Sequence, residues 1–230
     1  MPRLRCLLVP FLLAACAGAA LAANADPARA TRPAKHKTAA KELPGPPYAR
    51  RSDAMQAAEA IAEHLHIEPR WVRQVLGQAR YMASVARLAA PPAQGTAKNW
   101  DAYRKRFIEP LRIRAGVKFW LANRAALERA EQSTGVPPEI VVGIVGVETL
   151  YGQQTGKFRV LDALATLAFD FPAAHPRAAE RAAFFLAELE SYLDLTQRTG
   201  TDPLALRGSY AGAMGLPQFM PSSWQKYAID

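Results

Sequence analysis

The fold of this chain is decided by residues 134–152, which read TGVPPEIVVGIVGVETLYG. Its two prolines suit the first turn of a helix, and Gly152 suits a left-handed cap at the helix end. For more than two turns before Glu148 every residue is apolar or glycine, which predicts a helix that is buried on all faces. Gly143 and Gly146 each lower helix propensity by about 1 kcal/mol relative to alanine, which indicates close approach of neighbouring backbones.

Glu148 stands at the end of this predicted helix. A carboxylate in that place is either paired with a cation or desolvated toward its neutral form, and no Lys or Arg follows before Lys157. A raised pKa is what a general acid needs to stay protonated near neutral pH. The alternative is a solvent-facing glutamate at a frayed helix end, and the helix pattern alone does not decide between the two.

The apolar residues before this helix also follow helical spacing. One helix is predicted to begin near Ser52, and a second to begin near Pro69 and to end at Pro91 and Pro92. Two further helices are predicted after these. The apolar stripes of the four helices, in chain order, are Met55, Ala58 and Ile61; Trp71, Val72, Val75, Leu76, Ala79 and Met82; Trp100, Tyr103 and Phe107; and Ile113, Val117, Phe119, Trp120, Leu121 and Leu127. We expect the aromatic residues to lie in the core. Because no run alternates strictly enough for a strand, the predicted fold class is all-α.

A second informative stretch, residues 208–224, reads GSYAGAMGLPQFMPSSW. Its glycines are interleaved with Tyr210, Met214 and Phe219, which predicts a loop whose backbone can approach a ligand and whose apolar side chains suit sugar faces. Gln218 would supply hydrogen bonds. The same composition also fits a simple connection between helices.

Several motifs follow one another in a specific order. They are GVPPE at 135–139, VGVET at 145–149, LDALATL at 161–167, GAMG at 212–215 and QFMPSS at 218–223. With them, the segment 100–224 resembles the catalytic domain of the lytic murein transglycosylase B family, whose members are helical, lysozyme-like enzymes that cleave peptidoglycan glycan strands. The resemblance implies a lysozyme-like helical transglycosylase domain, and the residues before this segment match it more loosely.

The resemblance also implies roles for individual residues. Glu148 matches the family's single catalytic glutamate, Ser209 a serine that helps to hold the substrate's acetamido group, and Gln218 a glutamine of the cleft. Three further positions match residues that line the family's sugar groove, namely Phe119, Tyr210 and Met214. Arg181 is a weaker match to a basic residue of the family's cleft.

Two-carboxylate glycosidases pair an acid with a nucleophile or base, and Asp162, Asp170 and Asp194 are the candidate partners here. None has a setting like that of Glu148, and Asp162 suits a helix cap better. In the family one glutamate is enough. It protonates the glycosidic oxygen between N-acetylmuramic acid and N-acetylglucosamine, and its carboxylate then deprotonates the C6 hydroxyl, which closes a 1,6-anhydro ring. The alternatives are a hydrolytic muramidase and a noncatalytic peptidoglycan-binding fragment.

The resemblance implies an incomplete C-terminus. In the family a calcium loop begins near the position of Asp230, and further helices follow it. One carboxylate cannot hold a calcium ion, so we expect no metal and no other cofactor in this chain. The activity of a chain that stops at Asp230 is therefore less certain than its family.

The N-terminal residues 1–23 have the pattern of a signal peptide, with a basic start and a short apolar run. Two cleavage sites compete. Leu13-Ala14-Ala15-Cys16 resembles the lipobox of bacterial lipoproteins, which would place a lipid on Cys16, whereas the small residues that follow suit ordinary signal peptidase. Both cysteines of the chain lie in this segment, so the exported domain has no thiol pair.

Residues 24–47 are rich in Pro, Ala and Lys and predict a disordered linker, which leaves 48–230 as the catalytic domain. Residues 1–47 contain seven Lys and Arg but two Asp and Glu, so they carry +5 of the formal charge of +9. Nucleic acid is a poor partner, since binding it needs basic residues gathered on the folded domain. The expected partners are anionic peptidoglycan strands and, through the lipid, a membrane. The expected location is the periplasm, at the outer membrane.

Overall fold

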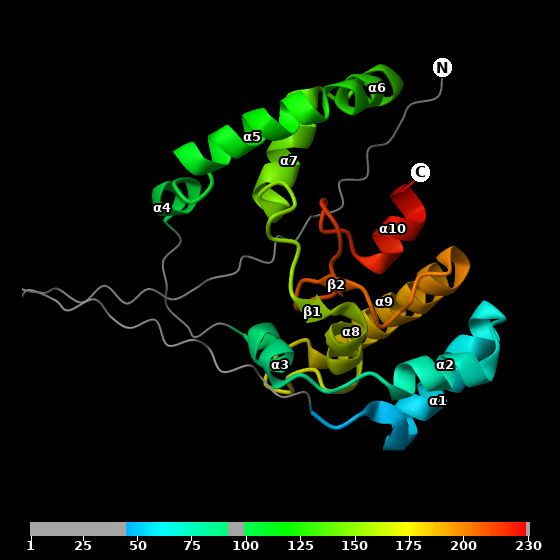
Figure 1. The fold of residues 1–230 in the computed structure, drawn as a ribbon. Coiled ribbons are helices and arrows are strands. Elements are labelled where there is room, and N and C mark those ends of the chain that lie inside the picture. The colour runs from blue at the N-terminus through cyan, green and yellow to red at the C-terminus, as the bar shows by residue number, and fades with distance from the viewer. Residues whose placement is uncertain (1–44, 92–98, 229–230) are drawn as a thin grey trace, which may run out of the picture. The chain divides into compact units, whose positions relative to one another are not determined.

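The computed structural model describes residues 45–91 and 99–228 (Figure 1). Cys16, the predicted signal peptide, nearly all of the linker and Asp230 lie outside these ranges. The elements are η1 (Tyr48–Arg50), α1 (Ser52–Leu65), α2 (Pro69–Gly77), α3 (Ala83–Ala89), α4 (Trp100–Arg104), α5 (Pro110–Ala122), α6 (Arg124–Thr134), α7 (Pro138–Thr149), β1 (Phe158–Arg159), α8 (Val160–Phe169), α9 (Ala178–Thr199), β2 (Arg207–Gly208) and α10 (Pro221–Tyr227). The described part is helical as predicted, apart from β1 and β2, which pair antiparallel. None of its helices combines the length and the hydropathy that a bilayer span requires.

The helix that is buried on all faces is α8. Its first eight residues, 160–167, are all buried. α8 lies side by side with α9 (Figure 1), and it also contacts α3 and β1. Its buried polar side chains are paired, because Asp162 accepts from the backbone N–H of Arg80 at 2.9 Å and Thr166 from that of Met82 at 3.0 Å. These bonds join the core helix to the segment between α2 and α3.

That segment interrupts the second predicted helix. α2 ends at Gly77, and α3 does not begin until Ala83. The backbone between them pairs with the residues at η1, where Tyr48 N–H donates to the carbonyl oxygen of Ala79 at 3.0 Å. The prediction of one continuous helix is wrong because this backbone forms its hydrogen bonds with α8 and with the start of the domain.

The segment from α4 to α6 also differs from its prediction. The expected continuous stripe from Ile113 to Leu127 is divided at Asn123 into α5 and α6, and Ile113, Val117 and Leu121 are exposed. Trp100 is 70% exposed, and the other aromatic residues of this segment are half-buried and outside the core cluster, so the expectation that they lie in the core is wrong. The Trp100 ring stacks on Tyr103 of the same helix.

α7 begins as predicted, with Pro137 as its N-cap and Pro138 in its first turn. The prediction that it is buried on all faces is wrong. α7 packs against α5 and α6. One face of the helix is buried, whereas another is exposed. The buried face consists of Val142, Val145, Gly146 and Thr149, and the exposed face includes Ile140, Ile144 and Val147.

The two glycines of α7 differ in the same way. A Cβ atom at residue 143 would meet nothing within 4 Å, whereas one at residue 146 would collide with the side chain of Tyr151. The predicted close approach of a neighbouring backbone is therefore wrong at both glycines, because Gly143 faces open space and Gly146 makes room for a side chain.

We expect the two apolar helices to respond differently to truncation. Leu164→Ala in α8 should lower the free energy of unfolding by about 2–5 kcal/mol, because it leaves a cavity in a fully buried site. Ile144→Ala in α7, at a side chain that is 53% exposed, should change it by about 0.5 kcal/mol. Urea unfolding followed by circular dichroism measures both, and equal losses would contradict the assignment of the core to α8.

Candidate active site

The end of α7 is a tight left-handed turn. Leu150 caps the helix at φ 49°, Tyr151 follows at φ 58° and Gly152 at φ 86°. The cap therefore begins two residues before the glycine that we predicted for it. Left-handed backbone is unfavourable for residues with a Cβ atom, and at functional sites it persists where the surrounding contacts determine it.

Glu148 lies in the last turn before this cap. Its side chain is exposed, and its carboxyl group has no hydrogen bond or ion pair with any other residue of the described ranges. Partial desolvation by burial raises the pKa of the Glu148 carboxyl above its ordinary value. The predicted direction of the pKa shift is confirmed, although the side chain is at the surface of the domain and is not enclosed in it.

Thr149, next to Glu148, ties the helix end to the loop of residues 208–219. Its side chain is fully buried, and its hydroxyl lies 3.1 Å from the carbonyl oxygen of Leu216 and 3.3 Å from that of Val145. The hydroxyl oxygen also accepts from the backbone N–H of Gly152 at 3.0 Å. Sequence reasoning missed this residue, because a threonine after a glutamate does not reveal which distant carbonyl it will reach.

The loop itself is folded by its own backbone. Met214 and Phe219 exchange two N–H to carbonyl hydrogen bonds, of 2.8 and 3.1 Å, and Ser209 N–H donates to the carbonyl of Ala213 at 2.9 Å. Where the glycines allow close approach, the neighbours are atoms of the protein itself, since a Cβ at Gly212 would meet the Leu164 side chain and one at Gly208 would meet the carbonyl oxygen of Ala213. These hydrogen bonds and close contacts therefore hold the loop in a compact conformation.

The predicted polar residues of this loop have hydrogen bonds within the protein. The Ser209 hydroxyl oxygen accepts from the N–H groups of Ala211 and Ala213 at 3.2 and 3.1 Å, which leaves its hydrogen available as a donor. The Gln218 amide nitrogen donates to the carbonyls of Thr155 and Gly215 at 3.2 and 3.0 Å, which leaves its amide oxygen as an acceptor.

The remaining predicted residues lie in different settings. The ring of Phe119 lies 5.4 Å from that of Tyr151, so α5 brings it to the turn after Glu148. Tyr210 is half-buried in the loop, and Met214 is 6% exposed and packs in the core. Arg181 lies on α9, where its guanidinium covers the rings of Phe184 and Phe185 at 5.1 Å.

None of the three candidate partner carboxylates is left unpaired. Asp162 is in the first turn of α8, where it pairs with Arg159 at 2.6 Å, so its predicted role as a helix cap is wrong. Asp194 pairs with Arg198 at 3.2 Å and accepts from Gln225. Within the described ranges no group of three or more His, Cys, Asp or Glu side chains is placed to hold a metal ion.

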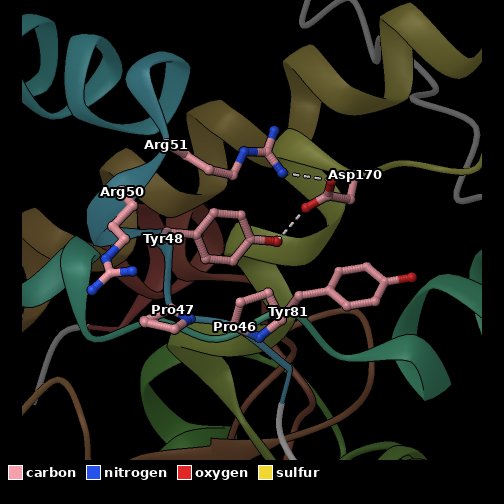
Figure 2. Close-up of a pocket in the computed structure, with 7 residues that line it drawn as sticks. All are labelled: Pro46, Pro47, Tyr48, Arg50, Arg51, Tyr81 and Asp170. Atoms are coloured by element: carbon pink, nitrogen blue, oxygen red, sulfur yellow. Dashed lines mark hydrogen bonds and ion pairs between the residues drawn. The ribbon is translucent and has the colours of Figure 1, made fainter.

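Asp170 belongs to a separate pocket of about 690 Å³, shown in Figure 2. The Tyr48 hydroxyl and the Arg51 guanidinium both point at its carboxylate, at 2.5 and 2.6 Å. Burial, and then the hydrogen bond to Asp170, raise the pKa of the Tyr48 phenol. These groups satisfy one another and hold the start of the domain on the end of α8, and none of the residues that line the pocket comes from α7 or from the loop.

Comparison with known proteins is decisive at this point. Residues 50–230 match the family model described as "Transglycosylase SLT domain". The chain belongs to the SLT-domain transglycosylase family. It is 42% identical over 194 residues to membrane-bound lytic murein transglycosylase B of Escherichia coli (strain K12), an alignment that covers 81% of this chain and 52% of the relative.

Solved structures of lytic transglycosylases are similar to this chain in both sequence and fold. The Escherichia coli lytic transglycosylase Slt35 in complex with bulgecin A is 44% identical, with a TM-score of 0.72 over 81% of this chain and 57% of that one. Soluble lytic transglycosylase SltB1 from Pseudomonas aeruginosa is 42% identical, with a TM-score of 0.71 over 77% and 57%. The chain thus spans about half the length of these relatives. The predicted family and its lysozyme-like helical fold are confirmed.

We expect the Thr149 bridge to be a large contributor to the stability of the site. Thr149→Val should lower the free energy of unfolding by about 1–3 kcal/mol, because it removes a fully buried hydroxyl and leaves the carbonyl of Leu216 and the N–H of Gly152 without this partner. Thr134→Val is a matched control, since the exposed Thr134 hydroxyl makes the same kinds of bond at the end of α6, to Ala130 and Val136, and water can replace it. Equal losses in the two variants would contradict a special role for Thr149.

Proposed function

We propose that this chain is a peptidoglycan lytic transglycosylase that cleaves the β-1,4 bond between N-acetylmuramic acid and N-acetylglucosamine. The observation that carries the proposal is the Glu148 carboxyl, which is unpaired among the described residues, partly desolvated, and placed in the last turn of α7, directly before a left-handed cap. Membership of the SLT-domain family supports the substrate class. One relative, SltB3 from Pseudomonas aeruginosa, 26% identical, was solved in complex with NAG-NAM-pentapeptide.

In the proposed reaction, Glu148 first acts as an acid. Its proton goes to the glycosidic oxygen, the bond from that oxygen to C1 of the muramic acid breaks, and N-acetylglucosamine leaves with a free hydroxyl. Glu148 is then a carboxylate and takes the proton of the C6 hydroxyl, whose oxygen bonds to C1. The carboxyl is restored, no water is consumed, and the product is a 1,6-anhydro ring.

The environment of Glu148 fits both halves of this cycle. A raised pKa increases the protonated fraction that the first step needs near neutral pH. The absence of a second unpaired carboxylate among Asp162, Asp170 and Asp194 favours a reaction in which the substrate supplies its own nucleophile. The Ser209 hydroxyl, the Gln218 amide oxygen and the Phe119 and Tyr210 rings are the groups that we assign to substrate binding, whereas the buried Met214 supports the loop from beneath.

The central test is Glu148→Gln. Glutamine keeps the shape but cannot deliver a proton, so the rate of glycan release from purified sacculi should fall by about 10²–10⁴. Glu139→Gln, the same change at the exposed start of α7, is the control and should keep its activity. Mass analysis of the products identifies the reaction, because anhydro ends are lighter by one water. Hydrated ends would indicate a muramidase, and binding to sacculi without release would indicate a noncatalytic wall-binding protein.

The same variant tests the electrostatic setting. A carboxyl whose pKa is raised on folding destabilises the folded state at pH values above the ordinary glutamate pKa, where the unfolded chain has lost the proton. Glu148→Gln should therefore raise the melting temperature at pH 7 relative to wild type, and the gain should shrink toward pH 4. A variant that is less stable than wild type at pH 7 would contradict the desolvated setting.

We also propose that the chain is exported and held at the outer membrane by a lipid on Cys16. The lipobox-like sequence supports this, and so does the relative that is named as membrane-bound. One acyl chain gives reversible binding, but lipoproteins carry several, which is enough for a stable anchor.

Cell fractionation tests the anchor. Wild type and the control Cys6→Ser should sediment with the outer membrane, whereas Cys16→Ser should appear in the soluble periplasmic fraction. Equal partition of Cys16→Ser and wild type would favour cleavage by ordinary signal peptidase instead.

A further inference from the structure

The phenol of Tyr151 occupies a notch between two helices. Its oxygen lies against Gly116 of α5 and Gly146 of α7, both of which are buried. A Cβ atom at Gly116 would lie 2.5 Å from this oxygen and 3.0 Å from the ring carbon that carries it, and a Cβ at Gly146 would lie closer still to both. The two glycines therefore provide the space that the phenol fills, and any larger residue would push the helices or the ring apart.

Two other contacts join α5 to the same turn of α7. The Arg112 guanidinium donates to the carbonyl oxygen of Gly146, one of the carbonyls near the helix end. The ring of Phe119 packs on that of Tyr151 at 5.4 Å. Arg112, Gly116 and Phe119 have the spacing of one helix face, so the whole α5 contact is directed at the turn that carries Glu148.

Tyr151 itself is in strained backbone. It and Leu150 both have positive φ, an unfavourable conformation for residues with a Cβ atom. Leu150 is held by burial, but no hydrogen bond joins the Tyr151 hydroxyl to any residue in the described ranges. The backbone N–H of Tyr151 donates to the carbonyl oxygen of Val145 at 3.3 Å, and packing in the notch is what fixes its phenol. The strain indicates that the position of Tyr151 matters.

We propose that Tyr151 is a positioning residue for Glu148. Its phenol acts as a wedge in the notch of Gly116 and Gly146, sets the separation of α5 and α7, and so places the Glu148 carboxyl relative to the sugar-binding surface at Phe119. The inference rests on the proposed transglycosylase function. It assigns Tyr151 no contact with the reacting atoms.

A double-mutant cycle tests the wedge. Gly116→Ala alone should displace the phenol and lower kcat by about 10²-fold while KM stays nearly unchanged, because a shift of about 1 Å in a reacting group has that effect on rate. Tyr151→Phe alone removes the oxygen and should have a small effect. In Gly116→Ala/Tyr151→Phe the new methyl group takes the place of the oxygen, so most of the lost kcat should return.

Two further variants serve as matched comparisons. Gly146→Ala should not be rescued by Tyr151→Phe, because its Cβ would still lie 2.7 Å from the ring carbon. Gly143→Ala, in the same helix but with open space at its Cβ, should keep wild-type kcat and KM. A general intolerance of α7 to alanine would affect Gly143→Ala as well.

The backbone amide NMR signals of Glu148 and Thr149 provide a readout that does not need activity. They should move in Gly116→Ala and return in the double variant to their positions in Tyr151→Phe. An active wild type with unchanged kcat in Gly116→Ala, or with no recovery in the double variant, would overturn the positioning role alone. A wild type that releases no anhydro product would overturn the proposed function, and the amide signals would still decide whether the wedge places Glu148: unmoved signals in Gly116→Ala would overturn it.

Discussion

The site depends on the hydrogen bonds that the buried hydroxyl of Thr149 makes. This hydroxyl bonds to the last turn of α7, to the turn that follows and to the carbonyl of Leu216 in a loop 67 residues away. Glu148 precedes it directly, so the position of the Glu148 backbone follows from where Thr149 is held. A left-handed turn of two residues with Cβ atoms would not persist without such contacts.

The rest of the domain provides a rigid base for this bridge. α8 is buried on every side, and the loop rests on it, since Gly212 packs directly against Leu164. The two-residue pairing of β1 with β2 places the start of α8 beside the start of the loop. Precise placement of a catalytic group requires this kind of support, because loops that are not packed have many conformations.

The setting of Glu148 shows how a partly exposed carboxyl can still suit acid catalysis. Arg112 of α5, which reaches the same turn of α7, donates to the Gly146 carbonyl, and Glu148 has no ion pair with any residue of the described ranges. Without a cation to stabilise its charged form, desolvation by burial alone acts on the carboxyl and raises its pKa. The same lack of a partner leaves it free to meet a substrate oxygen.

The sequence by itself determined the helical class, the start of α7 at two prolines, the place of Glu148 at the end of that helix and the family, because these depend on local periodicity and on ordered motifs. It did not determine which apolar helix is the core. A largely apolar pattern fits both α7 and α8, and only packing against α9 and α3 buries the second on every side. Nor did it reveal the bonds of Thr149 to Leu216, of Asp162 to Arg80 and of Asp170 to Arg51, or the contact of Tyr151 with Gly116, since the two residues of each pair are 35 or more positions apart. Tertiary structure decided these features, because hydrogen bonds and steric fit depend on distance in space, which a linear pattern does not contain.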